Sequence, residues 1–209
     1  VAFHSGSSNT LYVGSPSGGA WKTTDGGTNW TVLTDGNTVL GVSDIVVIPT
    51  AGSDIVYIGT GDRDVGSGWS MGGGQTNDNN GVGVLKSTDG GSTWSSTGLS
   101  WTASQKYKVN RLLVDPGNTD TLYAATSLGI YKTTNAGTSW TLMKSGSYID
   151  IEMTPSNSSI LYGCTEDYWG APVIDKTING GTSWTTVKTY ATTDARVDLA
   201  VTAANSTYV

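Results

Sequence analysis

The stretch KTTDGGTNW, residues 22–30, decides the fold because close copies of it recur along the chain. The copies are KSTDGGSTW (86–94), KTTNAGTSW (132–140) and KTINGGTSW (176–184). The tryptophans that end the four copies are 64, 46 and 44 residues apart. A phrase that recurs in this way indicates one supersecondary unit that is used several times.

Two further phrases recur upstream of the copies. One is TLYVG (10–14), IVYIG (55–59), TLYAA (121–125) and ILYGC (160–164), and the other is DIVVIP (44–49), RLLVDP (111–116) and DIEMTP (150–155). Together with the segments on either side of each nine-residue copy, these phrases predict four short strands in every repeat unit, separated by turn residues. The sequence therefore predicts an all-β chain, a β-propeller of four-stranded antiparallel blades. Stacked β-helices have shorter repeats, and sandwiches rarely repeat one turn motif four times.

The repeat also predicts where each blade lies. We expect blades at about 1–36, 40–98, 107–145 and 147–189, and the start of a fifth at 193–209. Four blades and two strands do not close neatly into a ring, since propellers typically have four to eight complete blades. Our hypothesis is that the chain is part of a larger propeller, whose remaining blades would be its partners.

The repeated nine-residue stretch (22–30 in the first copy), called the box from here on, is expected to be the turn between the third and fourth strands of each unit. Its Asp or Asn would accept backbone amides two residues on, its second glycine would need a positive φ, and its tryptophan would bond a carbonyl. Asn replaces Asp in two copies, a change that a catalytic carboxylate could not accept. We therefore assign a structural role to Asp25, Trp30, Asp89, Trp94, Asn135, Trp140, Asn179 and Trp184.

The pattern S/T-x-D-x-G-x-T-W resembles the Asp-box, or BNR, repeat. That repeat occurs in sialidases, sortilin (VPS10)-type receptors, xyloglucan-cleaving glycosidases and photosystem-assembly factors. The resemblance covers nearly the whole chain and implies a propeller in which the boxes are structural. It implies little about function, because these families do unrelated things.

Composition excludes several classes of function. A net charge of -6 with 13% charged residues leaves no basic stripe for a nucleic-acid partner. No run of 18 apolar residues could span a membrane, and Cys164, the single cysteine, allows no internal disulfide. Low lysine with much Thr, Ser, Gly and Asn is typical of exported bacterial proteins. We expect a secreted or cell-surface location, with the periplasm as an alternative.

Loop aromatics mark the candidate binding surface. In an antiparallel four-stranded blade, the boxes share one rim, and the second-to-third loops and the links between blades share the opposite rim. The candidate ligand-binding aromatics fall on that opposite rim: Trp69, Trp101, Tyr168 and Trp169. Flat rings suit a glycan or a protein ligand. The alternative is that each ring only covers its own loop.

Charged residues give two further candidate sites. Asp62, Arg63 and Asp64 stand at the base of a long loop (61–80), where Asn77 and Asp78 could add oxygen ligands for Ca²⁺, although the spacing fails the EF-hand pattern. We therefore expect no cofactor. An aligned column on the first strands holds Asp44, Arg111, Asp150 and Asp198. It predicts either ion pairs between blades or a polar ligand pocket.

Binding is favoured over catalysis. A glycosidase usually needs two carboxyl groups across the scissile bond, and Asp44, Asp62, Asp150 and Glu166 are available, but no spacing selects a pair. A sialidase-like site would need three arginines that bind the substrate carboxylate, and the three here, Arg63, Arg111 and Arg196, match it in number only. We expect a binding module for a glycan or a protein. The alternatives are a xyloglucanase-like or, less favoured, a sialidase-like hydrolase fragment, and an assembly factor that holds a protein client.

Overall fold

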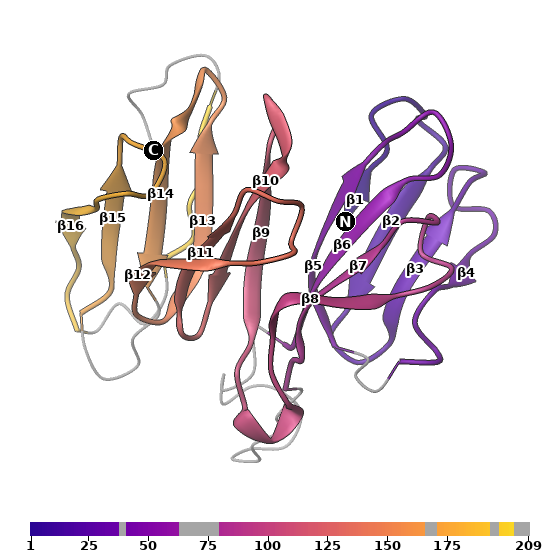
Figure 1. Cartoon of the computed structure of the whole chain (residues 1–209), viewed down its shortest axis with the longest axis horizontal. Coiled ribbons are helices and arrows are strands. Elements are labelled where there is room, and N and C mark those ends of the chain that lie inside the picture. The colour runs from indigo at the N-terminus through magenta and orange to yellow at the C-terminus, as the bar shows by residue number, and fades with distance from the viewer. Residues whose placement is uncertain (38–40, 63–79, 166–170, 193–196, 203–209) are drawn as a thin grey trace. The chain divides into compact units, whose positions relative to one another are not determined.

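The computed structural model of the 209-residue chain describes residues 1–37, 41–62, 80–165, 171–192 and 197–202. The chain divides into two compact units, residues 1–109 and 110–209, which are described separately. Each unit contains two four-stranded antiparallel sheets, and the strands of every sheet follow one another in chain order (Figure 1). The predicted all-β architecture is confirmed.

The first unit holds sheets 1 and 2. Sheet 1 consists of β1 (Ala2–Phe3), β2 (Leu11–Ser15), β3 (Gly19–Thr23) and β4 (Thr31–Val32). Sheet 2 consists of β5 (Val42–Ile48), β6 (Ile55–Thr60), β7 (Gly83–Ser87) and β8 (Ser95–Ser100). A short 3₁₀ helix, η1 (Ala103–Gln105), follows β8.

The second unit holds sheets 3 and 4. Sheet 3 consists of β9 (Val109–Asp115), β10 (Asn118–Thr126), β11 (Gly129–Thr133) and β12 (Thr141–Ser145). Sheet 4 consists of β13 (Tyr148–Thr154), β14 (Asn157–Thr165), β15 (Val173–Thr177) and β16 (Thr185–Thr189). Of the predicted fifth blade, residues 197–202 are described and form no strand, so that blade stays a prediction.

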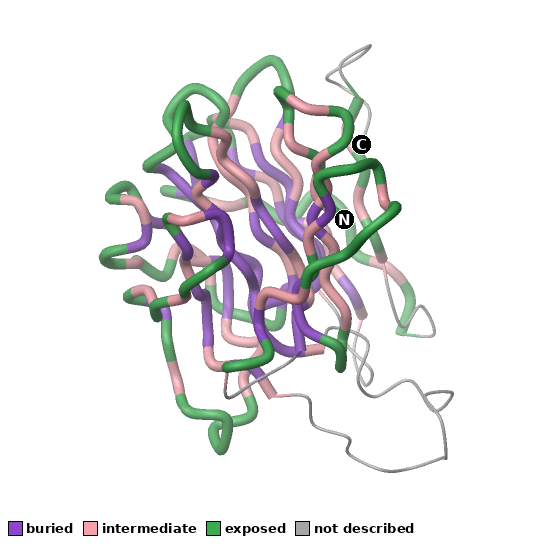
Figure 2. The backbone as a smooth tube through the Cα atoms, turned by 90° about the vertical axis from the view of Figure 1, so that its right-hand side faces the viewer, coloured by how far each residue is buried: buried purple, intermediate pink, exposed green. Residues whose placement is uncertain are grey.

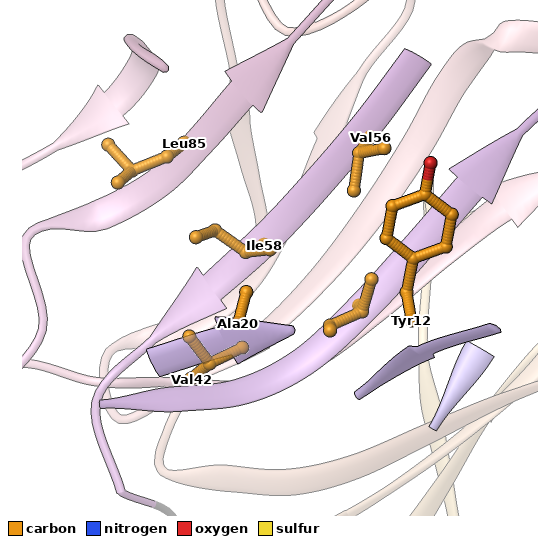
Figure 3. Close-up of a cluster of buried hydrophobic side chains, with 7 residues drawn as sticks. Tyr12, Ala20, Val42, Val56, Ile58 and Leu85 are labelled. Carbon is orange, nitrogen blue, oxygen red and sulfur yellow. The ribbon is translucent and has the colours of Figure 1, made fainter. Parts of the chain in front are cut away.

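Each unit has its core between its two sheets. Buried residues concentrate on the strands, and exposed residues on the turns (Figure 2). The first unit buries a cluster that joins sheets 1 and 2, shown in Figure 3: Tyr12, Ala20, Val42, Ile45, Val56, Ile58 and Leu85. The corresponding cluster of the second unit is Tyr123, Ala125, Ile130, Tyr148, Ile151 and Leu161. Strand residues alternate between two faces, so each sheet sends one apolar face into such a cluster.

The box is the turn between the third and fourth strands in all four sheets, as predicted. A buried threonine, Thr23 in the first copy, organises it: its hydroxyl donates to Asp25 Oδ1 (2.8 Å) and accepts the amide of Gly27 (3.0 Å). Asp25 Oδ1 also accepts the amide of Asn29 (2.9 Å). The carboxylate therefore bonds an amide four residues on, and the predicted bond to an amide two residues on was wrong because the threonine hydroxyl occupies that place.

Glycine and tryptophan behave in the box largely as predicted. The second glycine position has φ between 86° and 98° in the four copies, a region that favours glycine. The indole nitrogens of Trp30 and Trp184 each donate to a glycine carbonyl of their own box, at 3.0 Å. Trp94 donates instead to the carbonyl of Leu33, which follows β4 of the adjacent sheet. Trp140 is the exception, since its buried indole nitrogen has no hydrogen-bond partner among the described residues.

The two carboxylate boxes make the first unit sensitive to acid. Hydrogen bonds from Asn29 and Thr23 lower the pKa of Asp25 to about 2, and those from Thr93 and Ser87 lower the pKa of Asp89 to about 2. A carboxyl group whose pKa is lower in the folded than in the unfolded protein stabilises the fold. This contribution is fully present above the unfolded pKa, near 4, and is lost as the pH falls through the folded pKa.

We predict that the first unit loses stability between about pH 4 and pH 2 through these two groups. The double variant Asp25→Asn/Asp89→Asn should lose less stability over this range, because its boxes no longer take up protons. Urea midpoints measured from pH 5 to pH 2 for both proteins check this. An equal acid dependence in the two proteins would contradict it.

Candidate functional site

A groove beside Trp101 in the first unit is the candidate binding site. It has a volume of about 690 Å³ and is lined by residues of β7, β8, η1 and the segment after β4: Asn37, Val82, Leu85, Trp94, Ser96, Ser100, Trp101, Thr102, Ala103 and Gln105. A volume of this size is typical of sites that hold small ligands.

The short strand β4 explains why the groove exists. β4 has two residues, whereas β8 of the next sheet has six. After β4 the amide of Leu33 donates to the carbonyl of Ala20, and the hydroxyl of Thr34 accepts the amide of Ala20. The side chain of Thr34 thus takes the place of a backbone acceptor, and the chain leaves sheet 1 there. β7 and β8 consequently have no long strand opposite them.

Trp101 is fixed in place by its own loop. Its indole nitrogen donates to the carbonyl of Tyr107 (3.0 Å), and its ring meets that of Tyr107 edge to face, with centroids 5.9 Å apart. The loop contains η1, which begins after Thr102, where the amide of Thr102 donates to Gln105 Oε1 (2.8 Å). Trp101 therefore covers its own loop, as one alternative predicted, and it also lines the groove. Its role in binding a ligand stays a prediction.

The described lining of the groove is polar and uncharged. None of the described residues that line it is Asp, Glu, Lys, Arg or His; hydroxyls and amides lie beside two indole rings. The amide nitrogen of Asn37 is buried and has no hydrogen-bond partner among the described residues. A buried donor without an acceptor costs about 1–3 kcal/mol.

The second unit brings part of the charged column together. Arg111 on β9 lies 3.6 Å from Asp150 and donates to Glu152 at 2.8 Å, both on β13. Asp150 is buried and also accepts the amides of Ile151 and Leu199. The structure thus uses Arg111 in ion pairs between sheets 3 and 4. Its role in binding a ligand stays a prediction, and the sequence analysis missed Glu152.

A second polar cluster joins sheets 1 and 2 at the box end. Asp54 accepts the hydroxyl of Tyr12 (2.7 Å) and the Nε2 of His4 (3.1 Å), and Lys22 lies 3.8 Å from it. Burial, together with the bond to Asp54, raises the pKa of Tyr12 above its ordinary value. Tyr12, His4 and Lys22 each pair with Asp54, so the cluster stabilises the junction of the two sheets.

Other predicted site residues cannot be placed. Those outside the described residues are Arg63, Asp64, Trp69, Tyr168 and Trp169, together with Asn77, Asp78, Glu166 and Arg196. Asp62 is described and half-buried. Within the described ranges, no three His, Cys, Asp or Glu side chains gather as a metal site would require. Nor does any helix there have the length and apolar character needed to cross a membrane.

Comparison with known proteins extends the fold assignment. No family model and no curated protein matches the sequence. Among solved structures, the chain is similar to an ancestral GH74 enzyme, with a TM-score of 0.60 and 19% identity over 85% of this chain and 22% of that one. It is also similar to the GH74 xyloglucanase from Xanthomonas campestris, with a TM-score of 0.62 and 17% identity over 88% of this chain and 29% of that one.

These similarities concern the fold. A third structure, YCF48 bound to D1 peptide, has a TM-score of 0.48 and 14% identity over 86% of this chain and 50% of that one. The chain spans less than a third of the length of either GH74 enzyme. The four antiparallel sheets of this chain are accordingly blades of a β-propeller. The narrower Asp-box resemblance stays a prediction.

Proposed function

We propose that the chain is a binding module of a secreted or cell-surface protein and that the groove beside Trp101 holds a neutral saccharide. The observation that carries the proposal is the uncharged polar lining of this groove. A saccharide offers many hydroxyls and apolar ring faces, which suit hydroxyl and amide side chains beside indole rings. An acidic glycan would need a cationic side chain, and no described residue of the lining supplies one.

The unsatisfied amide of Asn37 also favours a ligand rich in oxygen. Its nitrogen is a donor that no described residue accepts. Binding that brings a sugar hydroxyl to this buried nitrogen would remove the cost of burying the donor.

A hydrolase is the alternative function. The GH74 similarity is compatible with it, although that similarity concerns the fold alone. A retaining or inverting glycosidase requires a pair of carboxyl groups at the bond that it cuts. No described residue that lines the groove carries a carboxyl group. We therefore propose binding rather than turnover at this place.

Asn37→Ala tests the proposal most sharply. Because Asn37 Nδ2 has no partner in the described part of the protein, its removal should leave the melting temperature unchanged or slightly higher. Loss of its bond to the ligand should weaken binding of a neutral oligosaccharide about tenfold, as one lost hydrogen bond of about 1.4 kcal/mol would. Titration calorimetry measures the affinity.

The controls separate binding from folding. Trp101→Ala should weaken binding and also lower the melting temperature, because Trp101 packs on Tyr107. Trp30→Ala removes a half-exposed indole outside the groove and should leave binding unchanged. A screen in which only peptides bind, or an Asn37→Ala variant with full affinity, would reject the saccharide proposal.

A further inference from the structure

The sequence repeat shows which residues of sheet 1 correspond to the buried face of sheet 2. Aligned on the boxes and on the LY/VY phrases, Trp21 corresponds to Leu85, and Leu11 and Val13 correspond to Val56 and Ile58. In sheet 2 these positions face sheet 1 and belong to the buried cluster in Figure 3. The cross-strand pairs Val13–Trp21 and Trp21–Val32 place the corresponding residues of sheet 1 on one face as well.

That face of sheet 1 is uncovered. Trp21 is 36% exposed, whereas Leu85 is 7% exposed, and Phe3 on the same face is 70% exposed. Leu11 and Val13 are half-buried, whereas Val56 and Ile58 are fully buried. The opposite face of sheet 1, with Tyr12 and Ala20, is the one that packs on sheet 2.

The first box is open on the same side. Gly90 of the second box and Gly180 of the fourth are buried, whereas the corresponding Gly26 is exposed. Gly180 is covered by the preceding blade of its unit, because its carbonyl accepts the hydroxyl of Tyr123 (3.1 Å) and the Nζ of Lys132 (3.0 Å).

A tyrosine and a lysine of the blade before also lie against the second box, at Gly90. The hydroxyl of Tyr12 lies 3.5 Å from the carbonyl of Gly90, and Lys22 lies over the ring of Tyr12, 4.9 Å from its centroid. Lys132 lies over the ring of Tyr123 in the same way, at 5.1 Å. In both units, therefore, a Tyr–Lys pair on one blade lies against a box glycine of the next.

We infer that the uncovered face of sheet 1 docks a further four-stranded blade of this same repeat, belonging to the same polypeptide. The tyrosine and lysine of that blade bond the carbonyl of Gly26 as Tyr123 and Lys132 bond Gly180. Its apolar residues cover Trp21, Val13 and Phe3. The inference does not depend on the proposed saccharide site, because the two involve different faces.

An appended blade tests the inference. A copy of residues 107–147, which carries the Tyr123–Lys132 pair, is joined ahead of residue 1 of the full chain. Docking should raise the melting temperature of the first unit by about 5 °C or more and protect tryptophan from quenching by acrylamide. Trp21→Lys in the fusion should abolish the gain, whereas Val187→Lys, which changes an exposed strand residue of sheet 4, should not.

Two measurements on the chain without the extra blade complete the test. Trp21→Lys should leave its melting temperature within about 1 °C, whereas Leu85→Lys, at the corresponding buried position, should unfold the first unit. Sedimentation velocity should show a monomer. A dimer that Trp21→Lys dissociates would make a second copy the occupant and overturn the inference, as would a fusion with no gain or with the same gain in Trp21→Lys.

Discussion

Replacing Tyr148 by Phe is expected to destabilise the second unit by about 2–3 kcal/mol, because its hydroxyl donates to the buried carboxylate of Asp175. Asp175 is 1% exposed and also accepts the hydroxyl of Thr186 (2.6 Å), with Lys144 at 3.5 Å. Removing one donor leaves a buried charge with fewer partners, and such losses are expensive. Urea unfolding of the variant measures the change.

The packing around Tyr148 shows why the pair is present. Asp175 corresponds in the repeat to Leu85 of sheet 2, and Gly163 corresponds to Ile58. A Cβ atom on Gly163 would lie 3.1 Å from the ring of Tyr148 and 2.8 Å from Ile130. The ring of Tyr148 therefore fills the space that an aliphatic side chain fills in sheet 2, and its hydroxyl reaches Asp175.

A double variant tests whether the buried carboxylate of Asp175 is the reason that the hydroxyl of Tyr148 is needed. Tyr148→Phe combined with Asp175→Leu removes the buried carboxylate at position 175 and restores the aliphatic residue that sheet 2 has there. The double variant should recover most of the lost stability, since replacing a buried polar pair by apolar residues is often neutral. If Tyr148→Phe alone costs under about 0.5 kcal/mol, or if the double variant is the less stable, the account is wrong.

The local part of the fold could be predicted from the sequence. Four hairpins, the position of each box between the third and fourth strands, and the positive φ of Gly27 and its equivalents all follow from turn chemistry within about ten residues. The repeat then fixes the strand order, because neighbouring strands are joined by short connections. The same reasoning missed Thr23, since its role depends on where its hydroxyl points.

Contacts between sheets could not be predicted in this way. Tyr12 and Asp54 are 42 residues apart, and Arg111 and Glu152 are 41 residues apart. In neither pair do the residues adjacent in sequence indicate which residue is the partner. Trp101 was a candidate because it is one of several aromatic residues in the loops of one rim, but Asn37 gave no such signal, since asparagine is ordinary in a turn. One signal was overlooked: Asp175 stands where the other three units have Trp21, Leu85 and Tyr131.

Thr177→Val in the fourth box is expected to cost about 2–3 kcal/mol although it preserves the shape of the side chain. The hydroxyl of Thr177 donates to Asn179 Oδ1 (2.9 Å) and accepts the amides of Asn179 (3.3 Å) and Gly181 (3.1 Å). Thr177 and Gly181 are both buried, so valine would leave at least one buried amide without an acceptor. Urea unfolding and hydrogen exchange at the Gly181 amide report the loss.

Asn179→Asp is the matched control and should change stability by less than about 0.5 kcal/mol at neutral pH. Asn179 Oδ1 accepts the amide of Ser183, and its nitrogen donates to the hydroxyl of Ser183 (2.9 Å). With an aspartate that hydroxyl can donate instead, as the hydroxyl of Thr93 donates to Asp89 in the second box (2.6 Å). The threonine hydroxyl is thus the centre of the turn, and either an amide or a carboxylate can complete it. An Asn179→Asp variant as unstable as Thr177→Val would show that the side chain at 179, rather than the hydroxyl at 177, holds the box together.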